Sequence, residues 1–212
     1  MTRGPSFDRV AHIYRWAEYV SLGPLLKHTR EHYLPQLTSC NRALVLGDGD
    51  GRFLARLLRQ NPSLHALAVD TSATMLQLLA KRCAFAGSRF EAMQASALAA
   101  NVPPQTDLIV THFFLDCLTQ QDVDHLTQRI SAQLQPGALW LLSDFAIPNS
   151  PLLRPLARLY IRSLYLAFRL LTGLRQTRLP DPQAALTQAG FVRIARHQKV
   201  YGLLYTELWQ RK

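Results

Sequence analysis

The glycine-rich stretch Gly47-Asp-Gly-Asp-Gly51 is the part of the chain whose residue types and spacing are best suited to chemistry. Glycines at alternate positions let the backbone turn sharply and approach a ligand without Cβ clashes. Asp70 follows nineteen residues after Gly51, where a carboxylate can accept hydrogen bonds from both hydroxyls of a ribose. Together the loop and Asp70 predict a site for a ligand that contains a nucleoside.

The elements that must position these residues follow from the apolar pattern. Apolar runs predict five strands, at 43–46, 64–69, 90–94, 107–111 and 139–142, with helical patterns between them. Such alternation favours a doubly wound α/β fold, a parallel sheet with helices on both faces. Two further runs, 191–197 and 201–209, predict an antiparallel pair that completes a seven-stranded, mostly parallel sheet.

The flanks of this pattern predict two helical additions. Residues 6–34 predict two helices broken near Gly23-Pro24, so we expect residues 1–42 to form an N-terminal helical cap. Residues 43–212 then form the ligand-binding domain. This domain includes a helical insert after the fifth strand, and residues 150–180 of the insert form a lid.

The spacing of the loop glycines separates two classes of nucleoside ligand. The dinucleotide fingerprint G-x-G-x-x-G requires glycine at position 52, where this chain has arginine, so a nicotinamide dehydrogenase is disfavoured. The pattern G-x-G-x-G resembles that of class I S-adenosylmethionine (SAM) methyltransferases. Asp70, the segment 107–113 and the turn 134–138 also resemble that class, over residues 43–145 in all. The resemblance implies SAM as cofactor and methyl transfer as the reaction.

Further motifs resemble a narrower group, the ubiquinone/menaquinone-biosynthesis C-methyltransferases and their relatives. They are Phe7-Asp-x-x-Ala11-x-x-Tyr14, Ser21-x-Gly23 and Asp144-Phe-x-x-Pro148. By this resemblance Asp70 would hold the ribose, Ser96 and Ala97 would flank the adenine, and His112 would line the pocket. The cofactor-binding residues expected in all are Gly47, Asp48, Gly49, Gly51, Asp70, Thr71, Ser96, Ala97 and His112. We assign no catalytic base, although Asp116 and Tyr14 are candidates near an acceptor.

An arginine-bearing apolar segment spans residues 152–172, and 14 of its 21 residues are apolar. Its arginines (Arg154, Arg158, Arg162 and Arg169) fall within a helical stripe roughly 80° wide and exclude a membrane-spanning segment. Two environments fit this segment: burial as a lid helix whose arginines reach water, or the interface of an anionic membrane. The insert at this place commonly covers the acceptor in the resembled class. Its composition predicts a small hydrophobic or aromatic acceptor, with one drawn from the lipid phase as an option.

The formal net charge of +10 is unevenly distributed: residues 1–42 carry +3, 43–149 carry −2 and 150–212 carry +9. The acidic middle suits the cationic SAM, with Asp48 and Asp50 in the loop itself. The basic ends favour an anionic partner, so RNA methylation is an alternative. The sequence Thr111-His-Phe-Phe-Leu lacks the polar-Pro-Pro-aromatic motif of base-amino methyltransferases, which disfavours nucleic acid. Val45 and Ser96 depart from the resembled pattern and leave open a non-catalytic methyltransferase-like protein that binds a membrane or a partner.

The N-terminal residues, the cysteines and the histidines predict the cellular compartment and whether the chain binds a metal. The first nine residues contain no apolar signal core, and the cysteines, Cys40, Cys83 and Cys117, are scattered and odd in number. We therefore expect a cytoplasmic protein, with peripheral membrane contact as an option. His28 and His32 have a spacing that metals use on a helix, but their basic neighbours repel a cation, so no metal site is expected.

Overall fold

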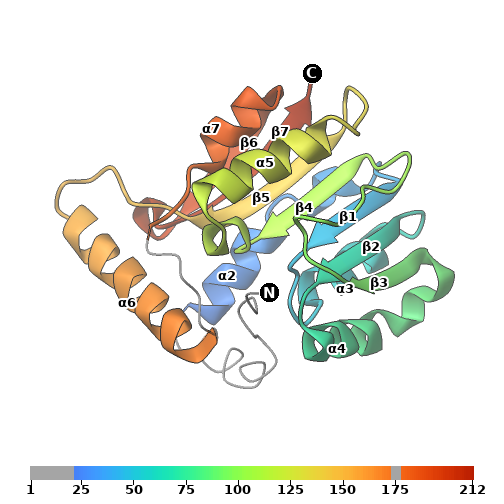
Figure 1. Ribbon diagram of the computed structural model, residues 1–212, viewed down its shortest axis with the longest axis horizontal. Helices are drawn as coiled ribbons and strands as arrows, with labels where there is room; N and C mark the ends of the chain where they lie inside the picture. The colour runs from blue at the N-terminus through green and yellow to red at the C-terminus, as the bar shows by residue number, and fades with distance from the viewer. Residues whose placement is uncertain (1–21, 173–177) are drawn as a thin grey trace.

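A computed structural model describes residues 22–172 and 178–212 and contains a seven-stranded sheet flanked by helices (Figure 1). The strands are β1 (Arg42–Leu46), β2 (His65–Asp70), β3 (Phe90–Gln94), β4 (Leu108–His112), β5 (Leu139–Phe145), β6 (Phe191–Lys199) and β7 (Leu204–Arg211). The α-helices are α2 (Gly23–Glu31), α3 (Arg52–Gln60), α4 (Ala73–Cys83), α5 (Gln120–Ser131), α6 (Arg154–Thr172) and α7 (Pro182–Gln188). Short 3-10 segments are η1 (Leu34–Leu37), η2 (Ala84–Arg89), η3 (Leu115–Cys117) and η4 (Val200–Gly202).

The strand order β3-β2-β1-β4-β5-β7-β6 places the predicted ligand loop at the centre of the sheet. The first five strands in this order are parallel, and β7 runs antiparallel between β5 and β6. The order reverses at β1, which pairs with β2 on one side and with β4 on the other. In doubly wound sheets, ligands bind in the crevice at the carboxyl ends of the strands at such a switch point.

Alternating side chains of the central strands feed two separate cores, one on each face of the sheet. Ala43 and Val45 pack into the core that contains α3 and η1, whereas Leu44 and Leu46 pack into the core that contains α5 and α7. Strands buried on both faces have continuous apolar sequences, which is why these segments could be predicted as strands. Figure 1 shows α5 and α7 side by side over one face, and α6 beyond the carboxyl ends of β4 and β5.

Side-chain caps determine where the helices begin. Ser72 accepts a hydrogen bond from the Met75 amide at the start of α4, and Asp181 accepts one from Ala184 at the start of α7. Thr119 and Asp122 form a reciprocal capping box at the start of α5. These caps satisfy amide groups that would otherwise lack partners at a helix N-terminus.

The predicted fold class is confirmed: the sheet has seven strands, is mostly parallel and carries helices on both faces. The predicted insert after the fifth strand forms α6, and the second of the two predicted N-terminal helices forms α2. The first of those helices, with Tyr14, and part of the lid at 173–177 lie outside the described residues. In the described part of the chain, no helix combines the length and apolar character needed to cross a membrane.

The outer hairpin of β6 and β7 contains a buried carboxylate with three donors. Glu207 is fully buried, and its Oε1 lies 2.9 Å from Nη1 of both Arg193 and Arg196, while Trp209 Nε1 donates to Oε2 at 2.9 Å. Arg193 and Arg196 would face opposite sides of a regular strand. A register shift between Arg193 and Ala195 brings them to the same side, as a β-bulge does.

Burial raises the pKa of Glu207 against the opposing effect of the arginines, so a neutral acceptor of the same shape is expected to be tolerated better than truncation. We expect Glu207→Ala to lower the free energy of unfolding by about 2 kcal/mol or more, because the indole N–H of Trp209 loses its hydrogen-bond acceptor. Glu207→Gln keeps an acceptor and should cost less. Urea unfolding of the two variants tests this, and an equal cost for both would contradict it.

Candidate active site

The loop between β1 and α3 is held in a conformation that only glycine adopts easily. Gly47, Gly49 and Gly51 all have positive φ, at 68°, 62° and 77°. A Cβ on Gly51 would lie 2.6 Å from the Leu79 side chain, so α4 packs directly on the backbone there. Among the described residues, a Cβ on Gly49 would meet no atom within 4 Å. The loop is therefore fixed on its inner side, and the described residues leave its backbone uncovered at Gly49.

The two loop carboxylates have different surroundings. Asp50 is paired with Arg52 Nε at 2.9 Å and with Arg82 Nη2 at 3.0 Å, so its charge is largely compensated within the protein. Asp48 Oδ2 accepts a hydrogen bond from the Leu54 amide at 3.1 Å. Of the two acids that the sequence suggested for a cationic ligand, only Asp48 lacks an ion-pair partner among the described residues.

Burial raises the pKa of Asp48 to about 7, and the carboxylates of Asp50 and Asp70 add to this, while the Leu54 amide and Arg30 lower it. Arg30 lies on α2 and was not among the predicted site residues. Its guanidinium lies 5.2 Å from the centroid of the Phe113 ring, and it also lowers the pKa of His112. Arg30 therefore approaches the loop and the end of β4, a contact between distant segments that no local sequence pattern reveals.

The end of β2 and the segment after β3 are held together beside this loop. Asp70 Oδ1 accepts from the Ser72 amide at 2.9 Å, and the Asp70 carbonyl accepts from the Ala95 amide at 3.1 Å. Thr71 and Ser96 are exposed, and Ala97 is buried with its carbonyl bonded to Arg129. The predicted ribose and adenine positions thus occupy neighbouring strand ends.

His112, the last residue of β4, is a buried polar side chain with no hydrogen-bond partner for either ring nitrogen within the described residues. It is 4% exposed, and its ring meets Phe53 edge-on at a centroid distance of 4.3 Å. Burial, with a smaller effect of Arg30, holds the pKa of His112 well below its ordinary value, so the imidazole is neutral. The next residue, Phe113, has a φ of 51°, a strained conformation typical of functional sites.

A buried carboxyl pair lies where β4 and β5 end. Asp116 and Asp144 are 5% and 2% exposed, and the Asp116 amide donates to Asp144 Oδ2 at 3.2 Å. Burial raises the pKa of Asp116 to about 6, and burial with the neighbouring Asp116 raises the pKa of Asp144 well above its usual range. Neither carboxyl forms an ion pair within the described residues. The pair therefore retains a proton at neutral pH.

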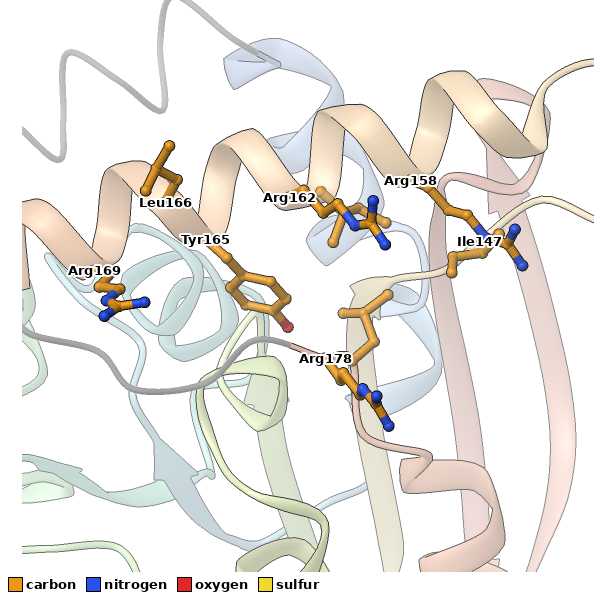
Figure 2. A pocket seen from close by; sticks show the side chains of 9 residues that line it. Ile147, Arg158, Arg162, Tyr165, Leu166, Arg169 and Arg178 are labelled. Carbon is orange, nitrogen blue, oxygen red and sulfur yellow. The ribbon is translucent and has the colours of Figure 1, made fainter.

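A cavity of about 710 Å³ lies beneath α6, close to this carboxyl pair (Figure 2). Tyr165 lines the cavity, and its hydroxyl donates to the Asp116 carbonyl at 3.0 Å. Ile161 and Tyr165 are buried against Cys117, Leu179 and neighbouring side chains, which attaches α6 to the turn after β4. The cavity volume is in the range of sites for small molecules.

The two histidines whose spacing would suit a metal, His28 and His32, make other contacts. His28 Nδ1 lies 2.6 Å from the Pro24 carbonyl, and the ring of His32 stacks on His197 at 3.8 Å. Over residues 22–172 and 178–212, no three His, Cys, Asp or Glu side chains gather in a way that could hold a metal ion.

The fold and the glycine loop agree with comparisons to known proteins. Residues 43–137 match the family model described as a methyltransferase domain. Together with the seven-stranded fold, this match over fewer than half of the residues bears out the resemblance to class I SAM-dependent methyltransferases, and with it SAM-dependent methyl transfer and the cofactor expected from the sequence.

Among individual proteins, the chain is 26% identical over 217 residues to the ubiquinone/menaquinone biosynthesis C-methyltransferase UbiE of Syntrophotalea carbinolica, with 95% of this chain and 90% of that protein covered. An O-methyltransferase family protein from Burkholderia thailandensis has a similar structure, with a TM-score of 0.74 and 16% identity over 100% of this chain and 65% of that one. The mitomycin 7-O-methyltransferase MmcR has a TM-score of 0.69 and 17% identity over 98% of this chain and 61% of that one. This chain thus spans less than two thirds of either solved structure, and these likenesses show the fold alone.

The carboxyl pair makes stability depend on pH. Because the folded-state pKa of Asp116 is raised, its contribution is fully present below the unfolded pKa and is lost as pH rises through about 6. Between pH 4 and pH 8 the wild type should lose on the order of 2 kcal/mol more stability than Asp116→Asn, because the asparagine side chain at position 116 does not titrate. Urea unfolding at both pH values measures the difference, with Asp124→Asn on α5 as control. Equal losses in wild type and Asp116→Asn would contradict the assignment.

Proposed function

We propose that the chain transfers a methyl group from SAM to a small hydrophobic or aromatic acceptor that binds beneath α6. The observation that carries this proposal is that two features lie at the carboxyl ends of neighbouring central strands. The glycine loop opens at the switch point beside β1, and the cavity under α6 is joined through Tyr165 to the turn after β4. In this proposal residues 150–180 are the lid and residues 1–42 the cap of the methyltransferase domain.

The residues present fit SAM. The described residues leave space for the ligand at the Gly49 backbone, and Asp48 supplies a carboxylate for its cationic part. His112, with two nitrogens that lack partners in the described part of the chain, offers one donor and one acceptor. We propose that SAM is held by the predicted set: Gly47, Asp48, Gly49, Gly51, Asp70, Thr71, Ser96, Ala97 and His112.

When bound, SAM supplies a methyl group on a sulfonium, and the protein's part is chiefly positioning. The buried end of β4 and the Phe53 ring, which meets His112 edge-on, exclude water from that side of the site. Holding the acceptor atom in line with the methyl carbon in a dry pocket accounts for a large share of the rate enhancement in such reactions. A base is needed only where the acceptor must lose a proton.

The class of acceptor is supported by the cavity and by the printed names of the relatives. Ile147, Ile161, Tyr165, Leu166 and Leu179 give the cavity an apolar lining. The relative UbiE is named for ubiquinone/menaquinone biosynthesis, and MmcR is named as a mitomycin 7-O-methyltransferase. A small hydrophobic or aromatic acceptor is therefore the class that we propose for this chain.

The outer face of α6 supports a membrane source for this acceptor. Leu156 and Leu159 are exposed at 65% and 66% and share one side of α6, and Leu152, just before the helix, is exposed at 84%. Exposed leucines on one side of a helix insert at a membrane interface, and the +9 charge of residues 150–212 favours an anionic one. We propose a cytoplasmic enzyme that makes peripheral contact with anionic membranes through α6.

The cofactor part is tested by calorimetric titration with SAM. Asp70→Ala removes the carboxylate expected to accept two ribose hydrogen bonds, so SAM affinity should fall roughly tenfold or more. Asp124→Ala on α5 is the control and should bind as the wild type does. Absence of SAM binding by the wild type would instead favour a non-catalytic methyltransferase-like protein.

The membrane part is tested by flotation with phosphatidylglycerol vesicles. Replacing Leu156 and Leu159 by serine should reduce the bound fraction several-fold, because it removes exposed apolar area from α6. Val192→Ser on β6 changes an exposed apolar residue outside α6 and serves as control. Failure of the wild type to float, or equal loss in the control, would argue against membrane contact.

A further inference from the structure

The cavity beneath α6 combines an apolar lining with an unusual number of arginines. Its nine lining residues include Arg158, Arg162, Arg169 and Arg178 and no acidic side chain. Figure 2 shows Arg158 and Arg162 projecting from α6 toward the side where Ile147 and Arg178 lie. A cavity that served only a neutral apolar ligand would have no need of four guanidinium groups around it.

Three of these arginines lack a partner in the described part of the chain. Within residues 22–172 and 178–212, Arg158, Arg162 and Arg169 form no ion pair and no hydrogen bond. They lie within about 40° of one another around the helix axis, so their charges repel across adjacent turns. By contrast Arg193 and Arg196, on β6, both pair with Glu207. The arginine cluster of α6 therefore has room for an anion from outside the chain.

The acidic groups nearest the cavity floor do not neutralise this cluster. Tyr165 separates the cavity from Asp116 and donates its hydroxyl to the Asp116 carbonyl. Asp116 and Asp144 are buried, and their carboxyl oxygens accept hydrogen bonds from the Cys117 thiol and from the amides of Asp116 and Phe145. The cavity thus has an apolar wall toward the sheet and positive charge toward α6.

We propose that this cavity binds a single anionic amphiphile, with its carboxylate or phosphate on Arg158, Arg162 and Arg169 and its apolar body against Ile161, Tyr165 and Leu179. Guanidinium groups bind such oxyanions with paired, charge-assisted hydrogen bonds, which gives them preference over neutral analogues. Resting on the proposed function, this ligand is the methyl acceptor, so the acceptor is a hydrophobic or aromatic acid rather than a neutral ring compound.

The test is equilibrium binding of dansyl-labelled undecanoic acid, followed by fluorescence in the absence of SAM, with its methyl ester as the uncharged comparison. The acid should bind the wild type at least roughly tenfold more tightly than the ester, because the ester cannot form charge-assisted bonds. Arg162→Gln should remove most of this preference and leave ester binding unchanged. Arg154→Gln, on the same helix but outside the cavity lining, should retain it.

The proposal is overturned by equal affinity for acid and ester in the wild type, or by an equal loss in Arg154→Gln and Arg162→Gln. Competition identifies the source of the anion. Monomeric dodecyl phosphate should displace the probe, whereas displacement by phosphatidylglycerol vesicles alone would assign the arginines to a membrane surface and overturn the single-ligand site. SAM titration of Arg162→Gln is run in parallel. Retained SAM binding with lost acid preference supports the cavity assignment, while lost SAM binding in the wild type would be a failure of the cofactor proposal only.

Discussion

The left-handed backbone of the loop between β1 and α3 is the constraint on which the ligand crevice depends. The loop has to leave the central strand, turn at the switch point and start a helix within a few residues, which three positive φ values allow. Leu79 packs against Gly51 from α4, and Asp50 is tied to Arg52 and Arg82, so neighbouring helices hold the turn in place. In residues 22–172 and 178–212, nothing covers the backbone at Gly49. An open surface on a rigid support is what a precise binding site needs.

Buried polar groups are compensated to different degrees in the outer hairpin and at the carboxyl ends of β4 and β5. In the outer hairpin, Glu207 has two arginines and an indole as donors, so its burial is compensated. At the carboxyl ends of β4 and β5 the compensation is incomplete. Among the described residues, His112 has no hydrogen-bond partner, and neither Asp116 nor Asp144 has a cationic partner. Natural proteins concentrate such unsatisfied groups where they bind or react, because elsewhere they only cost stability.

Local patterns predicted the fold well and the site in part. The strands were predictable because their residues are buried on both faces, and the loop because alternate glycines before a helix have few other uses. Arg30 was not predictable as a site residue, since its approach to Asp48 and Phe113 joins α2 to segments far along the chain. Asp144 was recognised only as part of a motif, because its pairing with Asp116 depends on how β4 and β5 align. For α6, spacing predicted the arginine stripe but not that Tyr165 would bond to the Asp116 carbonyl.

The surroundings of Asp48 carry a consequence for ligand exchange. With a pKa of about 7, this carboxyl is partly protonated at neutral pH. A positive charge brought beside it favours the ionised form, so a cation and a proton compete for the same oxygen atoms. Occupation by a cationic ligand would then expel a proton to solvent, and a ligand that loses its charge during turnover would be held less firmly once the proton returns. The loop would thus exchange a proton for a cationic ligand at Asp48, and this exchange would be most sensitive to pH near neutrality.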